Sequence, residues 1–182
     1  PAYAILFGIG KENGLSLNLA VMSNHRVIAV DPQEENVTRF RRVANEQGQY
    51  GSAVSAHQGT LQSFPLPPYL ASLIVVENLK AAGITLSETS VKKLFYPLRP
   101  YGGVACLRLT DEQHREFKVA VEKAGLAKAV VTRNGNWSLL RRAGALPKSA
   151  SWSHQYGDGS NSVVSRDLLV KAPLGVLWFG GP

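Results

Sequence analysis

The sequence predicts an α/β protein: a doubly wound, mostly parallel sheet of seven strands that ends in a C-terminal antiparallel hairpin and continues into an extended arm. Short apolar runs alternate with helical patterns as far as residue 124, which is typical of strands joined by crossover helices. Asn134-Gly135 then separates two apolar runs and is a strong hairpin signal. After Gly144 the chain becomes rich in Ser and Gly, which indicates an arm beyond the sheet.

The N-terminal segment carries the most specific pattern. Apolar runs at 3–7 and 27–30 predict buried strands, and the second run ends on Asp31. Between them lie the turn Gly8-Ile9-Gly10 and a helical pattern (Leu15, Leu19 and Met22). Such a unit can bind a nucleotide, because glycines let a ligand approach the backbone and a carboxylate accepts bonds from ribose hydroxyls. Asp31 follows Gly10 by about 20 residues, the usual spacing.

Both features also have a structural interpretation. Gly8 and Gly10 can simply allow close packing of a helix on the strand, and Asp31 can cap the next helix. The remaining elements follow in order. They are a helix that Asp31-Pro32 begins and Gly48 ends, strands at 53–57 and 70–76, a helix at 86–96, a strand at 104–109, a helix at 111–124 capped by Thr110 or Asp111, and strands at 127–133 and 137–142.

The domain organisation follows from the change in composition near Gly144. Residues 1–145 form the α/β domain, and 146–182 form a linker and arm with short strands at 163–170 and 174–179. The chain is 45% hydrophobic, which suffices for a core, and it has no apolar run of the about 18 residues that span a bilayer. Because it begins at Pro1 rather than Met, the lack of a visible secretory signal carries no conclusion.

The net charge and the histidine and cysteine residues give no positive sign of nucleic-acid or metal binding. The net charge is +7, but its densest cluster (Arg39, Arg41 and Arg42) lies on a predicted helix and is interpreted as a solvated face. Without a stripe of stacking aromatic residues, a nucleic-acid partner is disfavoured. The four histidines have no metal spacing, and Cys106 is the single cysteine, predicted to be a buried structural thiol.

Residues 1–145 resemble the Rossmann-type S-adenosylmethionine-dependent methyltransferase domain. Gly8-Ile9-Gly10 matches its first motif, Asp31 the acid that holds the cofactor ribose, and Gly59-Thr60-Leu61 the turn that contacts adenine. Residues 98–104, Leu-Arg-Pro-Tyr-Gly-Gly-Val, are similar to the family's Leu-(Lys/Arg)-Pro-Gly-Gly stretch before strand five, which a dinucleotide dehydrogenase has no reason to carry.

The resemblance implies methyl transfer from S-adenosylmethionine to an acceptor that the sequence does not identify. The donor carries its own leaving group, so the protein must position the reactants, and no catalytic residue is assigned. Glu77-Asn78 ends the strand at 70–76, where open α/β sheets bind ligands; a structural hydrogen bond is the alternative there. The expected cofactor-binding residues are Gly8, Ile9, Gly10, Asp31, Pro32, Gly59, Thr60, Leu61 and Glu77.

Three departures keep other functions open. Leu6 stands where the family usually has an acid, Glu12 replaces the third glycine, and Thr60 occupies a place often held by Asp. The alternative is therefore a degenerate, non-catalytic module for docking or spacing. A nicotinamide-dependent oxidoreductase is a third hypothesis, against which the antiparallel hairpin counts.

The arm carries a second resemblance. Trp152-Ser-His-Gln-Tyr, Asn161 and residues 171–178 look like the entry into a quinoprotein (PQQ-like) β-propeller, as in large bacterial, planctomycete-type proteins that join it to a methyltransferase-like domain. The propeller would then be a partner in the same polypeptide; the alternative is a simple arm. Location stays open, since S-adenosylmethionine is cytoplasmic whereas such propellers work outside the inner membrane.

Overall fold

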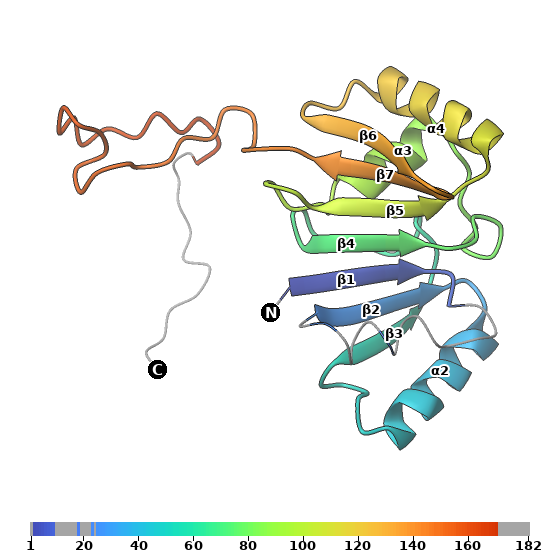
Figure 1. Ribbon diagram of the computed structural model, residues 1–182. Helices are drawn as coiled ribbons and strands as arrows, with labels where there is room; N and C mark the ends of the chain where they lie inside the picture. Colours follow the sequence, from blue (N-terminus) through green and yellow to red (C-terminus); the bar gives the residue numbers. More distant parts are fainter. Residues whose placement is uncertain (1, 10–17, 19–22, 24, 171–182) are drawn as a thin grey trace. The chain divides into compact units, whose positions relative to one another are not determined.

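A computed structural model describes residues 2–9, 18, 23 and 25–170 of the chain. The chain divides into two compact units, Pro1–Gly144 and Ala145–Pro182. The first unit contains a seven-stranded sheet in the order β3-β2-β1-β4-β5-β7-β6, with β7 antiparallel to both of its neighbours (Figure 1). The predicted fold class, a mostly parallel sheet ending in an antiparallel hairpin, is confirmed.

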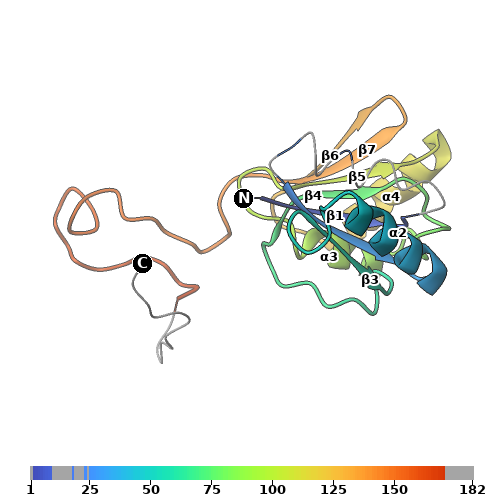
Figure 2. The ribbon, with the colours of Figure 1, turned by 90° about the horizontal axis from the view of Figure 1, so that it is seen from below.

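The strands lie close to their predicted positions. They are β1 Ala2–Phe7, β2 His25–Asp31, β3 Val54–Gln58, β4 Ala71–Val76, β5 Val104–Arg108, β6 Ala129–Asn134 and β7 Trp137–Arg142. The described helices are α2 Glu34–Glu46, α3 Glu88–Phe95 and α4 Asp111–Ala124 (Figures 1 and 2). The helical pattern predicted around Leu15, Leu19 and Met22 lies outside the described residues.

Alternation along β1 shows how the two faces of the sheet are covered. Ala4 and Leu6 pack with the α2 side chains, whereas Ile5 and Phe7 belong to the core formed with α3 and α4. Successive side chains of a strand point to opposite faces, so a strand buried on both faces is apolar throughout. This is why the predicted strands appear as continuous apolar runs rather than as alternating patterns.

The two long helices begin in different ways. Thr110 caps α4 in a capping box, in which its side chain accepts from the Gln113 N–H and the Gln113 side chain accepts from the Thr110 N–H. Of the two predicted caps, Thr110 is therefore correct. The N-cap of α2 is Gln33, which makes no side-chain capping bond, so Asp31 is not the cap but the last residue of β2.

The turn before β5 explains the most specific part of the family resemblance. The Arg99 N–H donates to the Ala71 carbonyl oxygen at 2.9 Å, which joins the starts of β4 and β5. A Cβ at Gly103 would lie 2.6 Å from the Arg99 carbonyl oxygen, so only glycine fits there. These residues lie at the amino-terminal edge of the parallel strands and build the fold.

Two smaller predictions need correction. Cys106 is half-buried rather than fully buried, and this burial raises the pKa of its thiol. No strand forms at 163–170, because these residues are mostly exposed and Asp167 accepts from the Leu169 and Val170 N–H groups. The strand predicted at 174–179 lies outside the described residues. Among the residues that are described, no helix is long and apolar enough to cross a membrane.

Candidate functional site

The ends of the parallel strands bring several of the predicted residues together. Phe7 pairs with Val30 on one side and with Val76 on the other, so Gly8, Asp31 and Glu77 follow at one edge of the sheet. β1 and β4 lie side by side in this sheet, and the chain continues outward from them in opposite directions. Such a point is where open α/β sheets bind ligands. Gly10 lies outside the described residues.

Asp31 is fully buried at this edge. Its Oδ2 accepts from the Ile9 N–H at 2.8 Å, and its Oδ1 accepts from the Gln33 N–H at 2.8 Å and from Asn36 Nδ2 at 3.0 Å. A buried carboxylate needs such donors, and here they connect the first turn to the start of α2. Asp31 therefore acts as a structural link between these two segments.

A nucleoside bound at Asp31 would have to compete with donors of the protein itself. Ribose hydroxyls would need an accessible carboxylate oxygen, and Asp31 has no exposed surface. They would have to replace a protein donor, such as the Ile9 N–H, at the carboxylate. Pro32, which follows Asp31, is half-buried and does not alter this conclusion.

Gly8 has a packing role that needs no ligand. Its φ is +83°, and a Cβ there would lie 3.2 Å from the backbone nitrogen and the Cβ of Ala82, in the turn after β4. Its N–H donates to the Val30 carbonyl oxygen at 2.8 Å. For Gly8, the structure thus shows the close packing that was the alternative to cofactor approach, with a loop rather than a helix as the neighbour.

The turn predicted to contact adenine is largely engaged in local bonds. The Gly59 N–H donates to the Asp31 carbonyl oxygen at 3.0 Å, and Thr60 Oγ1 accepts from the Gln62 and Ser63 N–H groups at 3.2 Å. Leu61 is buried in the core under α3 and α4. It also borders a surface hollow of about 530 Å³ between residues 61–66 and α3.

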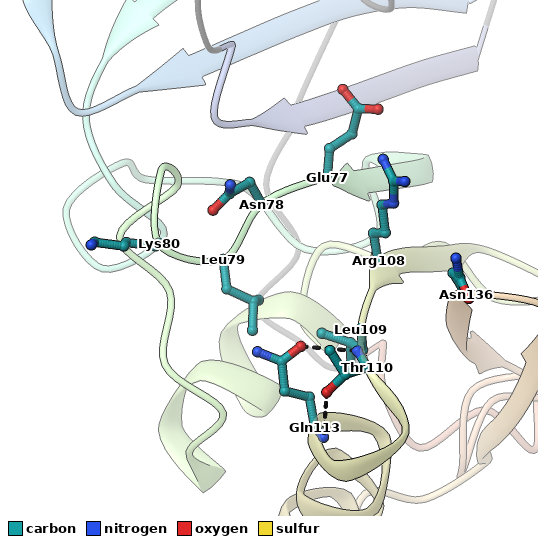
Figure 3. A pocket seen from close by; sticks show the side chains of 9 residues that line it. All are labelled: Glu77, Asn78, Leu79, Lys80, Arg108, Leu109, Thr110, Gln113 and Asn136. Atoms are coloured by element: carbon teal, nitrogen blue, oxygen red, sulfur yellow. Dashed lines mark hydrogen bonds between the residues drawn. The ribbon is translucent and has the colours of Figure 1, made fainter.

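A polar pocket of about 480 Å³ lies over the ends of β4 and β5 (Figure 3). Glu77 is exposed and is the one predicted site residue that borders this pocket. Asn78 Oδ1 accepts from the Ala81 N–H at 3.0 Å, the structural bond named as the alternative. The pocket is lined by Glu77, Asn78, Leu79, Lys80, Arg108, Leu109, Thr110, Gln113 and Asn136.

Four polar side chains of this pocket were not predicted from the sequence, and one of them, Lys80, lies in the turn after β4. Arg108 ends β5, Gln113 belongs to the capping box of α4, and Asn136 lies in the hairpin turn between β6 and β7. The Leu109 N–H donates to the Asn136 carbonyl oxygen at 2.9 Å, which holds the hairpin beside the end of β5. The signal was present, because a strand end and an Asn-Gly hairpin predicted on neighbouring strands must meet at one edge.

The histidines near these strands stay neutral more readily than free histidine. Burial, followed by Arg133 and Lys118, lowers the pKa of His114, whose Nδ1 lies 2.7 Å from Ser138 Oγ. Burial, followed by Arg41, lowers the pKa of His57. Within the described ranges, no group of three His, Cys, Asp or Glu side chains could hold a metal ion.

Solved structures share this fold. A provisionally assigned S-adenosyl-L-methionine-dependent methyltransferase from Methanococcus maripaludis has a TM-score of 0.66 at 14% identity, over 79% of this chain and 77% of that chain. A SAM-dependent methyltransferase from Aquifex aeolicus gives 0.57 at 19%, over 77% and 80%. Geranyl diphosphate C-methyltransferase from Streptomyces coelicolor A3(2), in complex with Mg²⁺, geranyl diphosphate and S-adenosyl-L-homocysteine, gives 0.60 at 10%, over 78% and 73%.

The chain therefore has the fold of S-adenosylmethionine-dependent methyltransferases. At these identities the likeness concerns the fold alone. No family model and no curated protein sequence matches the chain.

Proposed function

We propose that residues 1–145 transfer a methyl group from S-adenosylmethionine to an acceptor. The observation that carries the proposal is the sheet order, in which an antiparallel β7 lies between β5 and β6, as expected for this class of enzyme. The polar pocket at the ends of β4 and β5 supports it, because it lies next to the strand pair where open sheets bind ligands. Gly8, Ile9, Gly10, Asp31, Pro32, Gly59, Thr60, Leu61 and Glu77 are the proposed cofactor-binding residues.

A degenerate, non-catalytic module is the second candidate. The geometry around Asp31 favours it, since the acid that would hold the ribose is buried and bonded to the first turn. The contact between Gly8 and Ala82 favours it as well. In this case the unit would serve as a docking or spacer domain. A quinoprotein-like propeller of the same polypeptide is its proposed partner, and only the resemblance of residues 152–156, Asn161 and residues 171–178 supports this.

Calorimetric titration of the whole chain with S-adenosylhomocysteine separates the two candidates. The methyltransferase proposal predicts saturable heat for the wild type and weaker binding for Asp31→Asn, with circular dichroism to verify folding. The control is Asp111→Asn, which changes an exposed carboxylate of α4 and should bind like the wild type. Absence of heat in the folded wild type would reject the methyltransferase proposal and leave the non-catalytic module as the remaining candidate.

A further inference from the structure

The pocket at the ends of β4 and β5 receives opposite charges from two neighbouring strands. Val76 pairs with Leu107, so Glu77 and Arg108 follow in register and both border the pocket. Figure 3 shows Arg108 extending from the end of β5 toward Glu77, whereas Lys80 extends away from both. In the part of the chain that the structure describes, neither Glu77 nor Arg108 forms an ion pair.

Amide groups surround this pair of charges. Gln113 Oε1 accepts from the Thr110 N–H at 3.0 Å, which orients the side chain and leaves its Nε2 as a donor. The Asn136 amide, whose backbone bond to Leu109 fixes its position, lines the pocket beside Arg108. The pocket therefore presents one negatively charged carboxylate that accepts hydrogen bonds, one positively charged guanidinium that donates them, and two neutral side-chain amides.

The lining decides against an apolar ligand. Leu79 and Leu109 are its two apolar side chains, and Leu109 is itself buried in the core. A hydrocarbon chain placed here would cover Glu77 and Arg108 without bonding to them, which costs free energy because both would lose water. A ligand with one positive and one negative group would instead pair with each of them.

We propose that this pocket binds a small zwitterion of the amino-acid type. Its ammonium group is held by the Glu77 carboxylate and its carboxylate by the Arg108 guanidinium. The Gln113 and Asn136 amides bond to polar atoms of the ligand that these two groups leave unbonded. The inference goes beyond the proposed function, because binding requires neither the cofactor nor an accessible Asp31. If methyl transfer takes place, the zwitterion is the acceptor, and Glu77 then holds the acceptor in place of the cofactor; if it does not, the pocket is a binding site on a scaffold.

Three matched probes test the charge requirement on the whole chain. L-Alanine carries both charges, propionate lacks the ammonium group, and ethylammonium lacks the carboxylate. Titrations followed by ¹H–¹⁵N NMR should shift the Asn136 and Gln113 side-chain amide signals with L-alanine, at a dissociation constant in about the millimolar range, since exposed ion pairs are weak. Propionate and ethylammonium should bind at least about threefold more weakly, and added salt should weaken all three.

Two variants should each remove one of the two charge contacts with the zwitterion. Glu77→Gln should weaken L-alanine and ethylammonium but leave propionate unchanged, whereas Arg108→Met should weaken L-alanine and propionate but leave ethylammonium unchanged. Glu116→Gln and Arg115→Met, which make the same changes at exposed positions of α4 outside the pocket, should bind like the wild type.

Three results would overturn the proposal: no shift up to tens of millimolar L-alanine, equal binding of the three probes, or shifts outside the pocket. These results are independent of the proposed function, which the titration with S-adenosylhomocysteine tests. A chain that binds the cofactor product but not L-alanine would keep methyl transfer and lose the zwitterion. A chain that binds L-alanine alone would keep the zwitterion and lose methyl transfer.

Discussion

The ends of β2 and β4 offer a direct comparison, because β2 ends on an acid and β4 is directly followed by one at the same edge of the sheet. Asp31 is fully buried and accepts from Ile9, Gln33 and Asn36. Glu77 is exposed and borders a pocket. The difference lies in the nearby donors: two backbone N–H groups meet Asp31, whereas Glu77 faces a hollow. The availability of a carboxylate to a ligand is therefore set by its neighbours and not by its position in the topology.

Substitution of Asp31 should give the largest effect on stability. Asp31→Ala leaves the buried Ile9 N–H and the part-buried Gln33 N–H without their acceptor, and we expect the free energy of unfolding to fall by about 3–5 kcal/mol. Urea denaturation followed by circular dichroism measures this change. A loss of less than about 1 kcal/mol would contradict the structural role of Asp31 and favour a carboxylate held in place for a ligand.

Gly8→Ala should come next. A side chain at φ +83° is strained, and its Cβ would press on Ala82, so we expect a loss of about 2–3 kcal/mol in the free energy of unfolding. Gly48→Ala is the matched control, because Gly48 also has a positive φ but has open space around its Cβ position. It should cost about 1 kcal/mol. Equal losses in the two variants would show that the contact with Ala82 contributes nothing.

Acidification should destabilise the fold moderately, through two histidines. His57 lies in β3 beside β2, and His114 lies in α4, whose first turn borders the pocket at the end of β4. The pKa values of His57 and His114 are lowered from the ordinary 6.5, so below this pH the unfolded state binds more protons than the folded state. The contribution of these histidines to the free energy of unfolding should be constant above about pH 7.5 and fall as the pH drops through 6.5. Urea denaturation as a function of pH should show a shallower fall in His57→Gln and His114→Gln; an unchanged slope in both variants would refute this explanation.

Substitution of the pocket charges should change stability least. Glu77→Gln and Arg108→Met remove exposed groups that form no ion pair with the described residues, so the free energy of unfolding should stay within about 0.5 kcal/mol of the wild type. The same denaturation experiment measures it. A loss as large as that of Asp31→Ala would remove the contrast between the two strand ends.

The sequence predicted most of the fold because the signals were local. Apolar runs of strand length, the Asn134-Gly135 turn and the Thr110 cap each depend on residues close together in the chain, and each prediction was correct within a few residues. The strand predicted at 163–170 was wrong because an apolar run also needs a partner strand, and among the described residues it has none.

The candidate site was harder to predict because it depends on contacts between distant segments. Asp31 was identified from its spacing to the glycines, but its burial results from donors in the first turn and in α2. Arg108 and Asn136 meet only because β5 and β7 are neighbours in the sheet. Single residues at strand ends are visible in the sequence, whereas the hydrogen bonds that occupy them are not.

The crowding at Gly103 has a consequence for how such chains are recognised. Nothing larger than glycine fits beside the Arg99 carbonyl oxygen, so this geometry of the sheet requires glycine at position 103. It lies at the opposite ends of the strands from the predicted ligand edge. A match to the Leu98 to Val104 signature therefore reports the geometry of the sheet and not the state of the ligand edge.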